Sequence, residues 1–240
     1  MTYDFSAIAR ALPYLGEGMI FTLKLTLFAF LGGLVLGTVL AVIRHISVPV
    51  LDRVVWAYVT VMRSIPLIMV LFWFFFLVPL VLRKFSGGMA VSVSPQLTAF
   101  ATYTLFEAAY FCEIIRSGLF SVPRGQFEGA KALGFSTFQS YTLVIVPQAL
   151  KAVVPIMVTQ AIILFQDTSL VYVLSLTDFV GAASKIAQRD GKLVEFYTFA
   201  ALIYFIICSG FAELADHLLH RRSLKDTVRT PSPSAATAAS

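Results

Sequence analysis

The sequence predicts an all-α, polytopic membrane protein with about five transmembrane helices. Composition is the first reason: hydrophobic residues make up 58% of the 240 residues and charged residues only 13%. In soluble domains roughly 45–50% of the residues are apolar and about 25% are charged. The second reason is a series of continuous apolar runs. A helix of ~20 apolar residues crosses a hydrocarbon core of about 30 Å, and the runs lack the alternation of a membrane β-barrel.

The predicted spans follow one another along the chain and are separated by more polar segments. They cover residues 19–43, 54–77, 96–115, 149–174 and 196–219. Their orientation follows from the Lys and Arg residues of the connecting segments. With the N-terminus outside, the inner segments hold ten, namely Arg44, Arg53, Arg116, Arg124, Lys131, Lys151, Arg221, Arg222, Lys225 and Arg229. The outer segments hold six, namely Arg10, Arg83, Lys84, Lys185, Arg189 and Lys192. The positive-inside rule therefore favours a periplasmic N-terminus and a cytoplasmic C-terminus.

This topology predicts the organisation of the chain. Residues 1–18 form a periplasmic N-terminal segment, residues 19–222 a transmembrane domain with a cytoplasmic loop at 117–148, and residues 223–240 a cytoplasmic tail. We expect the tail to be disordered, because its Thr, Pro, Ser and Ala residues cannot bury enough apolar surface.

The sequence excludes several classes of function. It has no phosphate-binding loop, no nucleophile elbow and no cluster of His, Cys and carboxylate residues. Both cysteines, Cys112 and Cys208, fall in apolar runs, where we expect buried small side chains. We therefore expect no catalytic residue and no metal site. The net charge of +5 is explained by the topology and by anionic lipid rather than by nucleic acid.

The cytoplasmic loop has the pattern of two helices joined by a turn. Residues 128–133 are rich in helix formers, and Gly134 is a suitable helix stop. Ser136 and Gln139 match a capping box that begins a second helix, and Pro147 ends that helix or opens the next span. From the pattern alone, an amphipathic hairpin lying on lipid is an equally good interpretation.

The same residues resemble the EAA motif of permease subunits of ATP-binding-cassette (ABC) importers. That motif reads Glu-Ala-Ala, three residues, Gly, nine residues, Ile-x-Leu-Pro. This sequence departs from it mildly at Val144 and Val146, and at Gly129, which costs about 1 kcal/mol of helix stability relative to Ala. By resemblance, the residues that couple the chain to an ATPase are Glu128, Gly129, Ala130, Leu133, Gly134 and Pro147.

The resemblance covers about residues 8 to 222. Segments 22–27, 63–67, 106–110, 113–118 and 121–126 are similar to the polar amino acid branch of these permeases. Segment 165–172, Phe-Gln-Asp-Thr-Ser-Leu-Val-Tyr, is most similar to the glutamate/aspartate importers.

The resemblance implies a permease of the type I ABC importer fold in the bacterial inner membrane. It implies three protein partners: a cytoplasmic ABC ATPase dimer, a second and non-identical permease subunit, and a periplasmic amino acid-binding protein. ATP and Mg would be bound by the ATPase and no cofactor by this chain. The implied function is ATP-driven import of a polar amino acid, with glutamate or aspartate favoured.

Polar residues inside the spans are candidates for the substrate pathway, because ionisable groups in a membrane are costly. Glu107 lies near mid-span and needs a cation or a polar cavity, and an ammonium group is a suitable cation. Gln160 lies two turns before Asp167 on the same helix face. The candidates are Arg63, Glu107, Gln160, Gln166, Asp167, Thr168 and Ser169.

The same polar residues also have structural interpretations. Packing between two permease subunits uses similar residues, and for Arg63 a salt bridge with Asp52 or Glu113 is an equally good interpretation. A self-contained, proton-coupled secondary transporter is the alternative function. Such transporters usually contain internal repeats, and five spans do not divide into two equal halves.

Overall fold

The chain folds into helices joined by short turns. The computed structural model describes residues 6–86 and 93–227, with the side chains described up to residue 217. The elements are α1 (Ser6–Ile46), α2 (Pro49–Ser64), α3 (Leu67–Phe72), the π-helical turn η1 (Trp73–Leu77), α4 (Val78–Phe85), α5 (Pro95–Ser121), α6 (Arg124–Ala132), α7 (Thr137–Gln139), the π-helical turn η2 (Ser140–Ile145), α8 (Val146–Asp167), the 3₁₀ segment η3 (Thr168–Leu174), α9 (Phe179–Asp190) and α10 (Leu193–Thr227).

Four described segments are long and apolar enough to cross a membrane: Ser6–Ile46, Leu67–Phe85, Thr137–Leu174 and Leu193–His217. Helix α5, with 27 residues, is also long enough. It buries Thr102 and Glu107, so protein rather than lipid surrounds these polar groups, as the cost of burying them in lipid requires. The predicted all-α membrane fold with about five spans is confirmed.

Two helices extend beyond the predicted spans. Helix α1 begins at Ser6, inside the expected N-terminal segment 1–18, and α10 continues to Thr227. Residues 228–240 of the predicted disordered tail lie outside the described residues. Sequence analysis did not anticipate α9, whose alanines and polar residues form no long apolar run.

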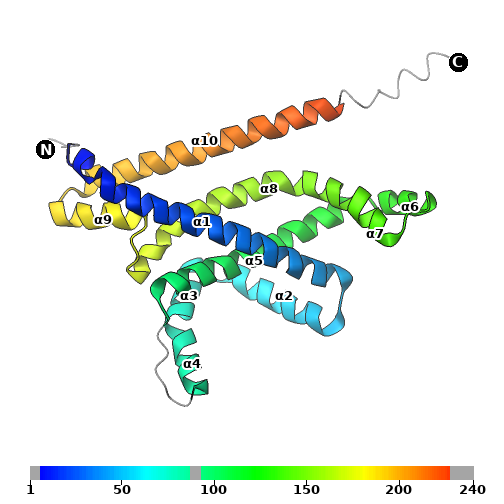
Figure 1. Cartoon of the computed structure of the whole chain (residues 1–240), viewed down its shortest axis with the longest axis horizontal. Helices are drawn as coiled ribbons and strands as arrows, with labels where there is room; N and C mark the ends of the chain where they lie inside the picture. The colour runs from blue at the N-terminus through cyan, green and yellow to red at the C-terminus, as the bar shows by residue number, and fades with distance from the viewer. Residues whose placement is uncertain (1–5, 87–92, 228–240) are drawn as a thin grey trace.

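The expectation of one helix over residues 54–77 is wrong. Helix α2 ends at Ser64, Ile65 is extended, and the chain resumes as α3 after Pro66. Proline lacks a backbone N–H and disfavours helical conformation at the residue before it. The apolar segment that follows, Leu67–Phe85, takes a direction different from that of α2 (Figure 1).

Small residues let α1 lie directly along α5. Ala29, Gly33, Gly37 and Ala41 recur every fourth residue of α1 and are all buried. A Cβ added at Gly33 would lie 2.7 Å from the Cβ of Glu107. Such close approach of backbones is how membrane helices gain packing energy where lipid offers no hydrophobic drive between them.

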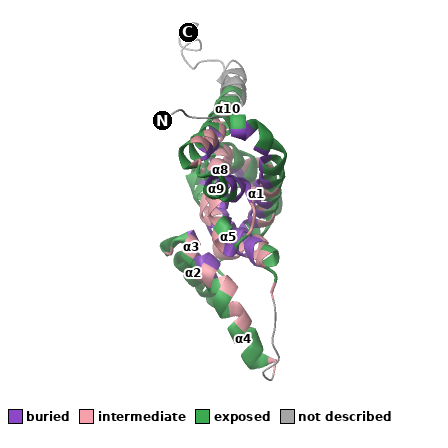
Figure 2. Ribbon diagram, turned by 90° about the vertical axis from the view of Figure 1, so that its left-hand side faces the viewer, coloured by how far each residue is buried: buried purple, intermediate pink, exposed green. Residues whose placement is uncertain are grey.

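The two ends of the molecule carry different elements. Figure 1 shows α9 and the first turns of α1 at one end, and α6, α7 and the turn between α1 and α2 at the other. Buried residues gather where α1, α5, α8 and α9 meet, whereas α4 is exposed or half-buried (Figure 2). The polar loop and the N-terminal helix turns are therefore separated by the length of the spans.

Candidate functional site

Helix α6 ends in a glycine turn. Gly134 has a φ of +84°, the left-handed region that glycine enters without steric cost. The N–H of Phe135 donates to the Ala130 carbonyl at 3.1 Å, and the N–H of Gly134 donates to the Lys131 carbonyl at 3.0 Å. These two bonds form a Schellman motif, which satisfies the last carbonyls of α6 and confirms the predicted stop.

The second helix of the loop begins with the predicted capping box. The N–H of Gln139 donates to the Ser136 hydroxyl at 3.2 Å, and the N–H of Ser136 donates to the Gln139 amide oxygen at 2.9 Å. Pro147 does not end this helix: it lies in the first turn of α8, directly after η2. The helix instead continues from Thr137 to Leu174, so the loop is fixed directly to a span.

The hairpin of α6 and the following helix has an exposed outer surface. Glu128 and Gly129 are exposed, Leu133 is 78% exposed and Phe138 is 76% exposed. Ala130 points the other way and is 5% exposed. An apolar and charged surface of this kind, held on a capped helix, is suited to contact with another protein.

The inner side of the hairpin is tied to α1 and α8. The rings of Phe127 and Tyr141 lie 5.6 Å apart, and Tyr141 also contacts His45 at the end of α1. The Gln148 amide donates to the Gln126 side-chain oxygen at 3.1 Å. Helix α6 is therefore anchored directly to η2 and α8, and through Tyr141 to the end of α1.

Glu107 and Gln160 meet in the interior. The amide nitrogen of Gln160 donates to the two carboxyl oxygens of Glu107 at 3.2 and 3.1 Å. Glu107 is 1% exposed and Gln160 is 8% exposed. Sequence analysis grouped both residues and the structure brings them together, but as partners of each other in the contact between α5 and α8.

The other predicted pathway residues of α8 and η3 have different contacts. The Tyr103 hydroxyl donates to the backbone carbonyl of Asp167 at 2.7 Å, and the Thr168 hydroxyl donates to the Phe165 carbonyl at 2.6 Å. The amide of Gln166, which is exposed, lies 3.7 Å from the sulfur of Cys208. Ser169 is half-buried. Among the described residues no hydrogen bond or ion pair joins this group to Glu107 and Gln160, although the Asp167 carboxyl group is near enough to act on Glu107 electrostatically.

Arg63 is exposed and its guanidinium lies 5.5 Å from the centre of the Tyr110 ring, a cation–π contact. The salt bridge that sequence analysis allowed is wrong for the described residues, because Asp52 and Glu113 both face Arg44 instead. Arg63 is therefore available to a partner on the outside of this subunit.

A buried aspartate caps α9, and the neighbouring backbone attaches α9 to α1. The Asp178 carboxylate accepts hydrogen bonds from the N–H groups of Val180 and Gly181 at 3.0 Å, which caps α9. The N–H of Phe179, the first residue of α9, donates to the Thr22 hydroxyl of α1 at 3.1 Å. Asp178 lies between the spanning segments, and burial raises its pKa from 3.8 to about 6.

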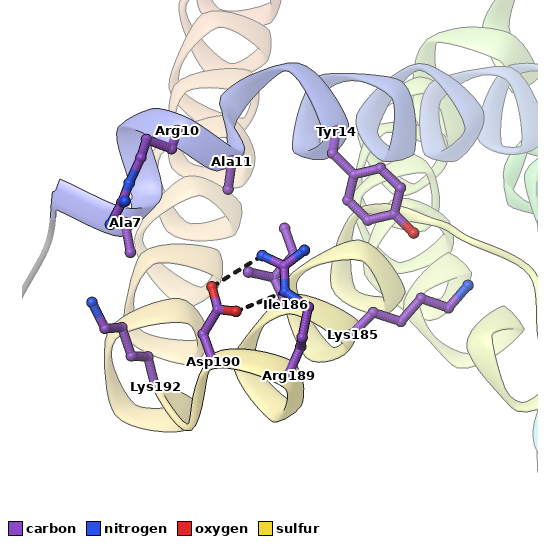
Figure 3. A pocket seen from close by; sticks show the side chains of 9 residues that line it. All are labelled: Ala7, Arg10, Ala11, Tyr14, Lys185, Ile186, Arg189, Asp190 and Lys192. Carbon is purple, nitrogen blue, oxygen red and sulfur yellow. Dashed lines mark hydrogen bonds and ion pairs between the residues drawn. The ribbon is translucent and has the colours of Figure 1, made fainter.

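This attachment creates a basic pocket that sequence analysis missed. Four residues of α1 line one side, and residues of α9 with Lys192 line the other (Figure 3). Its charged residues come from distant parts of the chain, at position 10 and at positions 185–192. The predicted outer position of these basic residues was the one indication of this pocket in the sequence.

The comparisons with known proteins agree over nearly the whole chain. The family described as "Binding-protein-dependent transport system inner membrane component" matches residues 5–225. Over 219 residues the chain is 47% identical to the glutamate/aspartate import permease protein GltK of Escherichia coli, which covers 91% of this chain and 98% of that protein. It is 33% identical over 215 residues to the probable glutamine ABC transporter permease protein GlnP of Bacillus subtilis. That match covers 88% of this chain and 95% of GlnP.

Solved structures show the same architecture. The crystal structure of an amino acid ABC transporter with histidines superimposes with a TM-score of 0.82 at 29% identity, over 92% of this chain and 100% of that one. The MetNI methionine ABC transporter superimposes with a TM-score of 0.69 at 21% identity, over 88% of this chain and 96% of that one. This likeness supports the fold alone. The chain belongs to the family of binding-protein-dependent transport system inner membrane components.

Proposed function

We propose that this chain is the permease subunit of an ATP-driven importer that carries glutamate and aspartate across the bacterial inner membrane. The observation that carries the coupling role is the exposed hairpin around Gly134, which is capped at both helix ends and continuous with a span. The assignment of glutamate and aspartate as substrates is supported by sequence identity. The chain is 47% identical to a glutamate/aspartate permease and 33% identical to a probable glutamine permease.

In this proposal, α6 docks in a groove of a cytoplasmic ATPase. Glu128, Gly129 and Leu133 form the docking surface, since all three are exposed. Ala130, Gly134 and Pro147 shape the hairpin and join it to α8. ATP and Mg are bound by the ATPase, whose closure moves α6. A docked element can transmit such a change only if its contacts differ between the two states.

The remaining partners follow from the same proposal. A periplasmic binding protein delivers the amino acid on the side of α9, and a second, non-identical permease completes the pathway. The exposed residues Arg63 and Gln166 face that subunit or the substrate. The N-terminus is periplasmic and the C-terminus cytoplasmic, as the distribution of basic residues favours.

The test is reconstitution of the complete importer in lipid vesicles with binding protein loaded with glutamate, aspartate, glutamine or arginine. We expect ATPase activity and uptake to be stimulated by the first two only. Equal stimulation by all four would remove the cargo assignment. Uptake driven by a proton gradient without ATP would favour the secondary transporter instead.

A further inference from the structure

The basic pocket lies at the end of the molecule opposite α6 and has a volume of about 710 Å³. Its floor is apolar and buried, formed by Ala7, Ala11 and Ile186, whose exposed fractions are 5%, 8% and 6%. Its rim carries charged groups and the Tyr14 ring (Figure 3). A concave site with an apolar floor and a few polar groups has the form of a ligand pocket.

The pocket carries an excess of positive charge. Four basic residues, Arg10, Lys185, Arg189 and Lys192, line it with a single acidic one, Asp190. The Asp190 carboxylate is held by Arg189 through bonds of 2.7 and 3.1 Å. This hydrogen-bonded guanidinium holds the pKa of Asp190 below its ordinary value. The pair therefore stays ionised at neutral pH, and the lining as a whole keeps a clear net positive charge.

Two residues of the pocket rim, Tyr14 and Lys192, lie where lipid headgroups are expected, and Arg10 lies about one helix turn further out than Tyr14. Lys192 immediately precedes Leu193, where the last span begins. On α1, Tyr14 lies five residues before the apolar run that starts at residue 19, about 7 Å at 1.5 Å per residue. The headgroup layer extends roughly 5–7 Å beyond the hydrocarbon on each side, and tyrosine is enriched in that layer.

We propose that this pocket binds the phosphate-bearing headgroup of an anionic phospholipid. The net positive lining is complementary to such a headgroup, and guanidinium and ammonium groups bind phosphate oxygens through charge-assisted hydrogen bonds. Leu193 and Val194, which are 50% and 57% exposed, lie directly beside Lys192 and offer contact for the acyl chains. The pocket volume far exceeds that of one phosphate ion, so a whole headgroup fits it better than a free anion. This binding does not depend on the proposed cargo.

Native mass spectrometry of the complete importer tests the proposal directly. The complex is purified in detergent and titrated with phosphatidylglycerol, with phosphatidylcholine of the same chains, and with inorganic phosphate. We expect phosphatidylglycerol to bind at least tenfold more tightly than phosphatidylcholine. In the double variant Arg10→Gln, Lys185→Gln, the ratio of the affinities for phosphatidylglycerol and phosphatidylcholine should fall roughly tenfold or more, because each basic group near an anionic lipid contributes to binding.

Two matched variants complete the experiment. Arg10→Lys with Lys185→Arg keeps both charges and should retain the preference. Arg83→Gln with Lys84→Gln removes two other basic residues, on α4 and outside the pocket, and should also retain it. An unchanged preference in the neutral double variant would overturn the proposal. So would competition by inorganic phosphate at equal concentration, or crosslinking of residue 10 to the acidic surface of the binding protein with lipid binding unaffected.

Discussion

The Nε2 atom of His45 lies 2.9 Å from the hydroxyl oxygen of Tyr141, although the two residues are 96 positions apart. Their rings meet edge to face with centres 5.4 Å apart. His45 is in the last turn of α1, and Tyr141 is in η2, directly beside Phe127 of α6. This contact joins the hairpin of α6 and the following helix to α1, the helix that packs most extensively on α5.

The first prediction removes that contact. Tyr141→Phe keeps the ring but deletes the hydroxyl, which costs a hydrogen bond worth about 1 kcal/mol net. We expect uptake per ATP hydrolysed to fall about twofold to fivefold, with the basal ATPase rate retained. Uptake and phosphate release are measured on the same reconstituted vesicles. Tyr172→Phe, at an exposed site on η3, is the control, and an equal loss there would contradict the role of Tyr141.

The second prediction concerns the docking surface. Glu128→Lys reverses the charge of an exposed side chain and leaves the buried contacts of α6 in place. The variant should insert into the membrane normally but fail to co-purify with the ATPase. Unimpaired transport by Glu128→Lys would show that α6 is not the coupling element.

The third prediction compares two glycines of the same helix. A Cβ at Gly33 would lie 2.7 Å from the Glu107 Cβ, whereas a Cβ at Gly16 would meet no described atom within 4 Å. Gly33→Ala should therefore destabilise the protein by about 1–3 kcal/mol through overpacking. Gly16→Ala should be neutral or stabilise it by up to about 1 kcal/mol, since alanine favours helix. Thermal melting in detergent checks both, and similar melting shifts would argue against close packing of α1 on α5.

The fourth prediction separates a structural role of Gln160 from contact with substrate. Gln160→Leu leaves the buried Glu107 carboxyl without its amide donor, at a cost of about 1–3 kcal/mol or more. In the background Glu107→Gln, the loss from Gln160→Leu should be smaller. Melting of the single and double variants gives the coupling energy between the two side chains. A large change in the KM for uptake at unchanged stability would instead favour substrate contact.

The fifth prediction is a pH dependence. The pKa of Asp178 rises from 3.8 to about 6 on folding, so the folded state binds the proton more tightly. Protonated Asp178 therefore contributes about 3 kcal/mol to the free energy of unfolding. This contribution is fully present below about pH 4 and is lost as the pH rises through about 6. Because asparagine also caps helices well, Asp178→Asn should flatten the melting profile between pH 4 and pH 8. Asp216→Asn, at an exposed site, should leave the profile unchanged, and a flat profile in the unaltered protein would contradict the prediction.

Local signals in the sequence were sufficient to predict the turn and the helix cap of the α6 hairpin. Gly134, Ser136 and Gln139 act on backbone groups within a few residues of themselves, so their spacing determines the turn and the cap. Pro147 was harder to interpret, since proline ends one helix and begins another equally well. Which of these occurs depends on the contacts of η2 with α6 and α1, which the sequence does not show.

Contacts between distant segments account for what the sequence did not predict. Helix periodicity placed Gln160 and Asp167 on one face, but it could not show that Gln160 is already occupied by Glu107. Arg44 forms the ion pairs with Asp52 and Glu113 that the sequence analysis considered for Arg63. The basic pocket depends on the attachment of α9 to α1, which is made by the Phe179 N–H and the Thr22 hydroxyl across 157 positions. None of these pairings has a short-range signature.

From Thr137 to Leu174 the backbone is helical for 38 residues without a loop, roughly 55–60 Å at 1.5 Å per residue. One end of this rod carries the capping box beside α6, and the other carries Asp167 and Thr168. Pro155 removes one hydrogen bond from its middle, which gives the rod a place to bend in addition to η2 and Pro147 near its first end. If α6 docks on an ATPase as proposed, a push on the hairpin would act on a lever arm, and the same helix that receives the force would move at its other end.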